Sequence, residues 1–268
     1  MKNRKLLVRG ILVAAIGMAL LLVVLIFCVY GSDKNLTLEK IAYDKSFRNP
    51  VVYIKENNGY APYLVLTSNY DGNVLLLRKY VLPESIPYLE HEPLWSHFEY
   101  ASYYEKSDID KFLNTDFLET LSPDVRAAIV DTTIEVTDIE SYDEWNYATH
   151  MIERKVFLLS TVELGVRGFD GSITTAEGKP LKYFRNKVYT KKIAYEEDGT
   201  ARSAYWTRTP DLMETCIVLV VSSTGGIGTA TAEHYLGVRP AFCMSRDTVV
   251  QKSDDIIAGE SVYILVID

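Results

Sequence analysis

Cysteine is scarce in this chain, with 3 in 268 residues, which excludes a small fold held together by disulfides. The 15 glycines and 9 prolines are too few for a collagen-like or low-complexity chain. The 4 histidines never stand four residues apart, and no cysteine pair accompanies them. The sequence therefore predicts no zinc site, and nothing in it indicates a cofactor.

Positive charge is limited as well, and it is unevenly placed. The formal net charge is −8, which argues against nucleic acid as a partner because binders of nucleic acid carry basic surfaces. Residues 1–31 hold Lys2, Arg4, Lys5 and Arg9 but no acidic residue. All 36 acidic residues follow, so the remainder of the chain is strongly acidic.

Long apolar runs are absent after residue 30, but Gly10 to Tyr30 carries no charge and is long enough to cross the ~30 Å core of a bilayer as a helix. We predict a cytoplasmic tail over residues 1–9, a transmembrane helix over 10–30 and a stalk over 31–49. The basic residues before the helix place the N-terminus in the cytoplasm and the C-terminal part outside the cell membrane. A cleaved signal peptide is the alternative, although the apolar run exceeds the usual core of roughly 7–15 residues.

The order of strand-like and helix-like segments in residues 50–268 predicts one extracytoplasmic α+β domain. It should have a mainly antiparallel sheet, a few short helices and long loops. Two apolar runs around Asp71-Gly72 indicate a hairpin. Ser107 and Ser122 are typical N-caps of short helices, and Ser160 with Glu163 forms a capping box. The polar stretch 165–199 predicts long loops, where functional residues often lie.

Other segments predict how strands pair. The apolar runs 51–54 and 262–267 are expected to pair, because the ends of a domain often lie close together. Cys216 and Cys243 each lie in a strand-like run, and both a disulfide and two free buried thiols are compatible with the sequence. The glycine-rich run 224–229 indicates a hairpin loop, because no βαβ unit follows it.

Five strings in the second part of the chain are similar to those of the bacterial family of domains of unknown function numbered 6273 (DUF6273). They are Val74–Leu77, Ser107–Asn114, Lys155–Ser160, Tyr205–Pro210 and Gly237–Phe242, and the resemblance covers about residues 50–245. It implies a fold like those of C-type lectins and formylglycine-generating enzymes, but no established activity. The paired active-site cysteines and the calcium-binding signatures of those folds are missing from this sequence.

Tyr205, Trp206 and Arg208 are the candidate ligand-binding residues, because aromatic rings stack on sugars and arginine pairs with carboxylates. The alternative is that Arg208, like Arg239, is a buried structural group paired with an acid. No catalytic constellation is recognisable, so no catalytic residue is predicted. We therefore expect a membrane-anchored, non-enzymatic surface protein that recognises a glycan, a wall polymer or a protein. A cell-wall hydrolase with paired carboxylates and an accessory module of a membrane complex are the alternatives.

Overall fold

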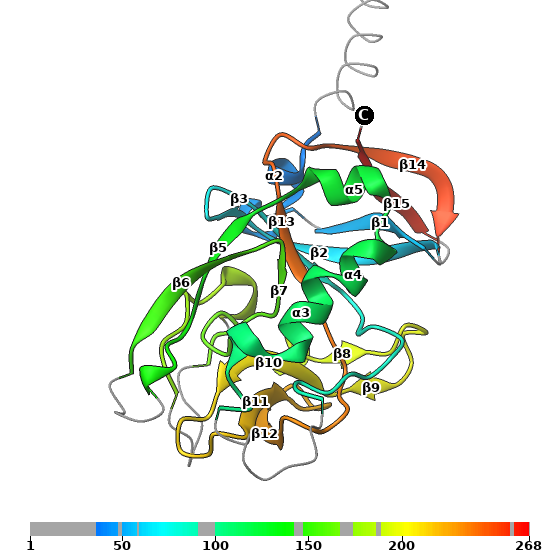
Figure 1. Cartoon of the computed structure of the whole chain (residues 1–268). Coiled ribbons are helices and arrows are strands. Elements are labelled where there is room, and N and C mark those ends of the chain that lie inside the picture. The colour runs from blue at the N-terminus through cyan, green and yellow to red at the C-terminus, as the bar shows by residue number, and fades with distance from the viewer. Residues whose placement is uncertain are drawn as a thin grey trace, which may run out of the picture.

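The computed structural model describes residues 36–47, 50–57, 59–90, 100–141, 147–166, 174–185, 189–257 and 260–267. Most of the regular structure in these ranges is β (Figure 1). The described α-helices are short, and the longest of them has 7 residues. They are α2 (Leu38–Ile41), α3 (Asp108–Asn114), α4 (Asp116–Thr120) and α5 (Pro123–Ala128).

An 8-stranded sheet forms the centre of the molecule. Its strands, from one edge to the other, are β14 (Val249–Ile257), β15 (Glu260–Val266), β1 (Val51–Glu56), β2 (Gly59–Tyr70), β3 (Asn73–Arg78), β13 (Ala241–Met244) and β4 (Ile129–Val130). The eighth strand, β7 (Val156–Phe157), also pairs with β13. The sheet is mixed, because β1 pairs with β15 in parallel and its other ladders are antiparallel.

Smaller sheets lie below and beside the 8-stranded sheet in the view of Figure 1. Three strands form the sheet β10 (Tyr205–Pro210), β11 (Ile217–Val221) and β12 (Ile227–Thr231). A two-stranded ribbon consists of β5 (Thr132–Thr137) and β6 (Thr149–Arg154), and a shorter one of β8 (Ala194–Tyr195) and β9 (Arg202–Ser203). Short 3₁₀ helices complete the described part: η1 (Tyr43–Lys45), η2 (Tyr104–Lys106), η3 (Lys182–Phe184) and η4 (Tyr189–Lys191).

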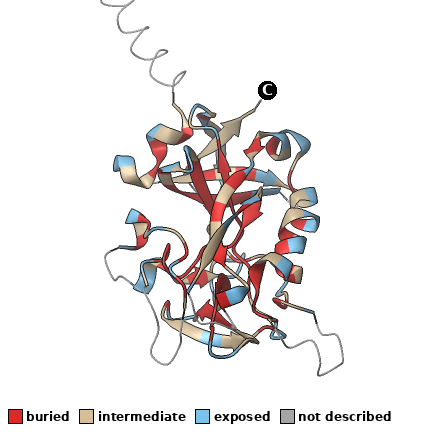
Figure 2. Cartoon of the chain, turned by 60° about the vertical axis from the view of Figure 1, so that its left-hand side comes forward, coloured by how far each residue is buried: buried red, intermediate tan, exposed pale blue. Residues whose placement is uncertain are grey.

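The hydrophobic core is formed largely by apolar side chains of the central strands. Five successive residues of β3, from Val74 to Arg78, are buried, since both faces of the sheet are covered. Figure 2 shows buried residues along the sheet and on the inner sides of the helices. Strands of this kind read as continuous apolar runs rather than as an alternating pattern.

The expected α+β class with a C-type-lectin-like fold is wrong: the described chain is mostly β, with a curled central sheet. The predicted helix starts are real, because Ser107 Oγ accepts the N–H of Asp110 at 3.2 Å and α5 begins at Pro123. However, these helices end after one or two turns. Capping signals mark where a helix begins, but its length depends on how much apolar surface its neighbours can cover.

The predicted transmembrane helix, residues 10–30, lies outside the described residues and gains no support. Among the helices that the structure describes, none is long and apolar enough to cross a membrane. The stalk prediction is wrong for residues 36–47, because Leu38 and Ile41 of α2 are fully buried in the core. Two apolar residues in one helical turn are too short a pattern to indicate packing from sequence alone.

The pairing predictions are confirmed in part. Tyr53 of β1 faces Ile264 of β15, so the first and last strands of the domain do pair. The hairpins around Asp71-Gly72 and around the glycines 225–228 also form. Cys216 and Cys243 are free thiols: Cys216 directly precedes β11, Cys243 lies in β13, and these strands belong to different sheets.

Candidate functional site

The three predicted ligand-binding residues are buried, so they form no recognition surface. Tyr205, Trp206 and Arg208 are 3%, 1% and 0% exposed. The Tyr205 hydroxyl donates to the carbonyl of Lys192 at 2.8 Å, and Trp206 Nε1 donates to the carbonyl of Ile86 at 2.8 Å. Both polar groups therefore act within the fold.

Arg208 is the centre of a buried polar cluster. Its guanidinium forms two hydrogen bonds to the Glu163 carboxylate, at 2.8 and 2.9 Å, and both side chains are 0% exposed. It also donates to the main-chain carbonyls of Glu135 and Leu158. Although burial opposes its charge, the Glu163 carboxylate raises the pKa of Arg208, so the guanidinium stays protonated. Arg208 is therefore a buried structural residue paired with an acid, which was the alternative to ligand binding.

The capping box around Glu163 forms its bonds without a helix. Ser160 N–H donates to Glu163 Oε2 at 2.9 Å, and Glu163 N–H donates to Ser160 Oγ at 3.1 Å. The chain then turns at Gly165, which has φ +79°, instead of continuing as a helix. Ser160 Oγ also donates to the carbonyl of Glu177 at 2.6 Å, which explains this serine without a catalytic role.

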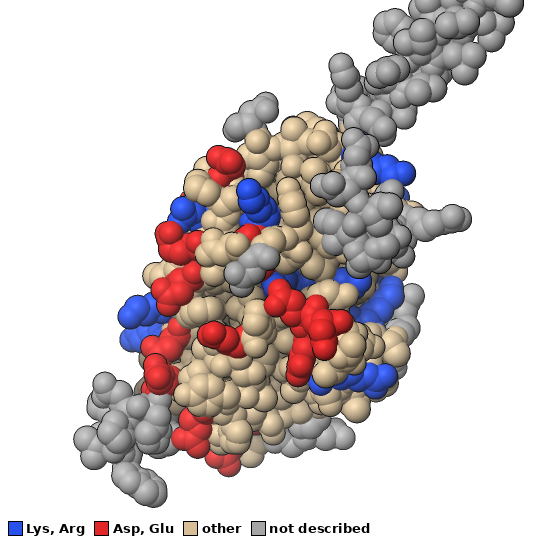
Figure 3. Space-filling view, turned by 90° about the vertical axis from the view of Figure 1, so that its right-hand side faces the viewer, with Lys and Arg blue, Asp and Glu red and all other residues tan. Residues whose placement is uncertain are grey.

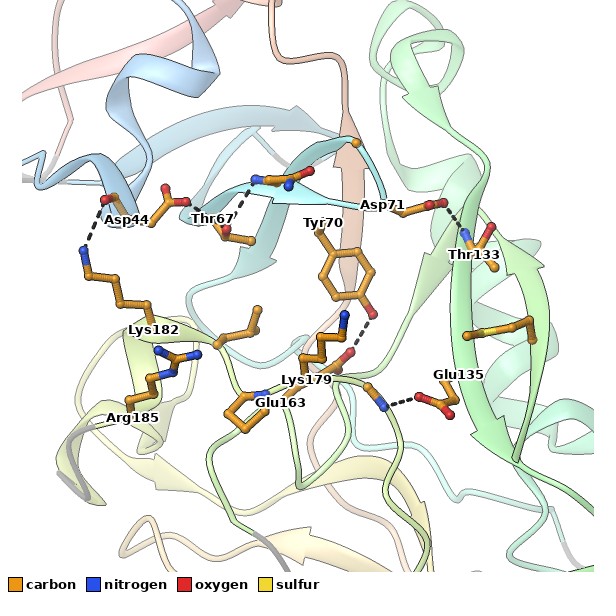
Figure 4. Close-up of a pocket in the computed structure, with 16 residues that line it drawn as sticks. Asp44, Thr67, Tyr70, Asp71, Thr133, Glu135, Glu163, Lys179, Lys182 and Arg185 are labelled. Carbon is orange, nitrogen blue, oxygen red and sulfur yellow. Dashed lines mark hydrogen bonds between the residues drawn. The ribbon is translucent and has the colours of Figure 1, made fainter. Parts of the chain in front are cut away.

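A cleft of about 680 Å³ opens beside this cluster (Figure 4). Its walls come from η1, the β2–β3 hairpin, the β5–β6 ribbon and the segment 178–185. Tyr70 points across it, and its hydroxyl donates to Glu163 Oε1 at 2.5 Å (Figure 4). Burial and the neighbouring Glu163 raise the pKa of Tyr70, so the phenol stays protonated. The cleft has the size of sites that bind small molecules or short polymer segments.

The carboxylates of the cleft are held by donors of the protein itself. Asp44 accepts both the N–H and the hydroxyl of Ser68, and it accepts the hydroxyl of Thr67. Glu135 accepts the N–H of Gly178 at 2.9 Å and the hydroxyl of Thr149. These bonds leave the acids little freedom to move toward a substrate.

Asp71 is also held, by the N–H of Thr133 at 2.9 Å. It extends from the turn of the β2–β3 hairpin toward the ribbon, on the same side of the cleft as Glu135 (Figure 4). This end of the cleft therefore presents carboxylate oxygens, whereas Lys182 and Arg185 lie at the opposite end and Lys179 lies between the two ends (Figure 4).

Three exposed cations, Lys179, Lys182 and Arg185, lie on the segment 178–185. Lys182 donates to the carbonyl of Asp44 at 3.2 Å, and no ion pair joins any of the three to an acid in the part of the chain that the structure describes. Lys182 and Arg185 lie on the side of the cleft near Asp44, and Lys179 lies near Tyr70 (Figure 4). The ammonium and guanidinium donors of Lys179 and Arg185 are therefore available to a ligand.

Both signs of charge occur on another face of the molecule. Figure 3 shows acidic and basic side chains interspersed on the face that lies to the right in Figure 1. Over the described ranges, no group of three or more His, Cys, Asp or Glu residues is placed to hold a metal ion. The arrangement in the cleft suits hydrogen bonding and charge pairing with a ligand.

Only one wall of the cleft lies in a segment that the sequence singled out for function. The cations lie within the polar stretch 165–199, which was expected to hold functional loops. Their spacing of three residues, at positions 179, 182 and 185, was a signal that could have been used. Asp44 and Glu135 could not be assigned to the site, because they approach it only through the pairing of distant elements.

One comparison with known proteins gives a match. The family model described as domain of unknown function (DUF6273) matches residues 71–246. This range includes the hairpin turn, the ribbon and the cationic segment of the cleft, whereas Asp44 lies before it. No curated protein and no solved structure matches the chain.

Proposed function

The chain belongs to the DUF6273 family, and we propose that it is a non-enzymatic recognition domain whose cleft binds a glycan, a wall polymer or a protein. The observation that carries this proposal is the division of roles in the cleft. Its carboxylates accept hydrogen bonds from the protein, whereas Lys179 and Arg185 offer donors that no described acid engages. Free donors that line a cleft of this size support a binding role.

The hydrolase alternative needs two carboxylates that can exchange protons with a substrate. Asp71 and Glu135 lie at the same end of the cleft, which is the observation in favour of this alternative (Figure 4). Against it, each carboxylate is held by a backbone N–H of the protein, which limits its approach to a substrate. Recognition is therefore the better-supported function. The bacterial origin, the extracytoplasmic location and a role as an accessory module stay predictions.

The first experiment applies the full chain to arrays of glycans, wall polymers and proteins. A variant with a bulky residue at the cleft, Met151→Trp, should lose binding. Met151 lines the cleft and is 63% exposed, so the change should leave the core intact. The matched control is Met213→Trp, because Met213 is 52% exposed and does not line the cleft.

Three outcomes would contradict the proposal. If no ligand binds above background, or if both methionine variants bind as the unchanged chain does, the cleft is not a recognition site. Release of soluble products from a bound polymer, absent in Glu135→Gln, would favour the hydrolase instead.

A further inference from the structure

The cationic segment of the cleft is fastened to the buried cluster, which fixes where its charges lie. Leu181 N–H donates to the carbonyl of Glu163 at 3.0 Å, and Gly178 N–H donates to Glu135 Oε2. A Cβ at Gly178, whose φ is +78°, would lie 2.8 Å from Glu163 Oε1. Only glycine fits so close to the carboxylate, so the segment is held on both sides of Lys179.

This attachment makes the site preorganised for an anion. The backbone that carries Lys179 and Lys182 does not have to be ordered when a ligand binds, so less conformational entropy is lost. Arg185 follows directly after η3, whose Phe184 is 2% exposed and packs in the core. The three cations therefore project from an anchored turn.

The negative charge nearby does not cancel this preference for an anion. Glu163 is paired with Arg208 inside the protein, and the oxygens of Asp44 face Thr67 and Ser68. Asp71 and Glu135 lie at the end of the cleft opposite Lys182 and Arg185, with Lys179 between the two ends (Figure 4). Their remaining lone pairs accept hydrogen bonds, which suits the hydroxyl groups of a ligand.

From this geometry we propose that the ligand is an acidic glycan: a hydroxyl-rich polymer that places a carboxylate or phosphate between Lys179, Lys182 and Arg185 and its hydroxyls toward Asp71 and Glu135. The inference rests on the proposed recognition function and names the ligand class of the same cleft. Arginine pairs with carboxylate and phosphate through two parallel hydrogen bonds, and lysine adds a point charge. An acidic peptide such as polyglutamate carries its charges without hydroxyl groups, so it lacks the hydroxyl donors that Asp71 and Glu135 would accept from a glycan.

The test measures binding of the full chain to four polymers. Polygalacturonate offers carboxylates on sugars, and poly(glycerol phosphate) offers phosphates beside hydroxyls. Dextran is the neutral glycan and polyglutamate the acidic peptide. We expect one or both of the first two to bind at least about tenfold more tightly than dextran and polyglutamate, with an affinity that falls as salt is added.

A double variant tests the assignment to the cationic segment. Lys179→Gln/Arg185→Gln should weaken binding of the acidic glycan at least about tenfold and should reduce its dependence on salt. The matched control, Lys55→Gln/Arg202→Gln, also removes one lysine and one arginine, from exposed positions that do not line the cleft. This control should bind within about twofold of the unchanged chain. Both variants should retain the thermal unfolding of the unchanged chain, since they alter exposed side chains.

The outcomes separate this inference from the proposed function. If dextran binds as tightly as the acidic glycans and the Lys179/Arg185 variant has no effect, the inference is wrong while recognition of a glycan stands. If polyglutamate binds best and depends on the same two cations, the ligand class is an acidic peptide and the inference is also wrong. If none of these polymers and no ligand of the arrays binds, both proposals are wrong.

Discussion

At the scale of the residue, the most informative pair is Arg208 and Glu163. The sequence offered two interpretations of Arg208, ligand binding and structural pairing, and its neighbours could not decide between them. The carboxylate that decides the matter lies 45 positions earlier in the chain. Partners at such distances become neighbours only when β10 packs beside the turn at residues 160–165.

Replacing Arg208 with methionine should destabilise the protein strongly. The Arg208→Met variant leaves the Glu163 carboxylate buried without its partner, which costs about 3–5 kcal/mol. Urea unfolding measures this loss. Arg202→Met is the control, because Arg202 is exposed on β9, and it should change the free energy of unfolding by no more than about 0.5 kcal/mol. A loss below about 1 kcal/mol in Arg208→Met would contradict the buried pair.

Asp110 predicts a dependence of stability on pH. It is 4% exposed in α3, and burial raises its pKa to about 6 although Arg154 donates to both carboxylate oxygens. The folded state therefore binds this proton more tightly than the unfolded state. The resulting stabilisation is complete below the ordinary pKa of 3.8 and is lost as the pH rises through about 6.

The Asp110→Asn variant isolates this effect because asparagine does not titrate. The free energy of unfolding of the unchanged protein should fall relative to that of the variant by roughly 3 kcal/mol between pH 3.5 and pH 7. Denaturant unfolding at several pH values measures the difference. If the free energy of unfolding of the unchanged protein minus that of Asp110→Asn stays constant or increases with pH, Arg154 rather than burial controls the ionisation of Asp110.

At the scale of the element, turns and caps were the features that sequence predicted best. The hairpin at Asp71-Gly72, the start of α3 and the β11–β12 hairpin each depend on residues close together in the chain. The length of the helices was predicted poorly, because it depends on packing against distant strands. The capping box at Ser160 shows the difference: its two bonds form as expected, but a turn follows them.

The β11–β12 hairpin allows a test with two adjacent glycines. Gly225 has φ +85°, and a Cβ there would lie 2.2 Å from the carbonyl oxygen of Tyr189. A Cβ at Gly226 would lie 3.6 Å from Ser222 Oγ, which is an ordinary contact. Gly225→Ala should therefore lower the free energy of unfolding by about 2 kcal/mol or more, whereas Gly226→Ala should change it by no more than about 0.5 kcal/mol. Equal thermal stability of the two variants would contradict this turn geometry.

At the scale of the whole molecule, strands from the two ends of the predicted domain meet in the central sheet. Apolar runs at both ends predicted that β1 and β15 pair, and the structure confirms the pairing. Their parallel direction was not predictable from these runs, because it depends on the path of the chain between them. The same path brings α2 against the sheet, where a stalk was expected, and places Asp44 in the cleft.

The pairing of β15 makes the last residues essential to the sheet. Deleting residues 261–268 removes most of the strand between β14 and β1, including Val262, which is 6% exposed, and Tyr263, whose ring packs against Phe47 at 5.7 Å. We expect a loss of at least about 3 kcal/mol, which corresponds to a fall in melting temperature of roughly 6–12 °C for a domain of this size. Hydrogen exchange gives the readout specific to pairing: amide protons of β1 around Tyr53 should lose protection, while those of β10 and β11, in a separate sheet, should keep it. If the shortened chain melts as the full chain does and β1 stays protected, β15 does not complete the sheet.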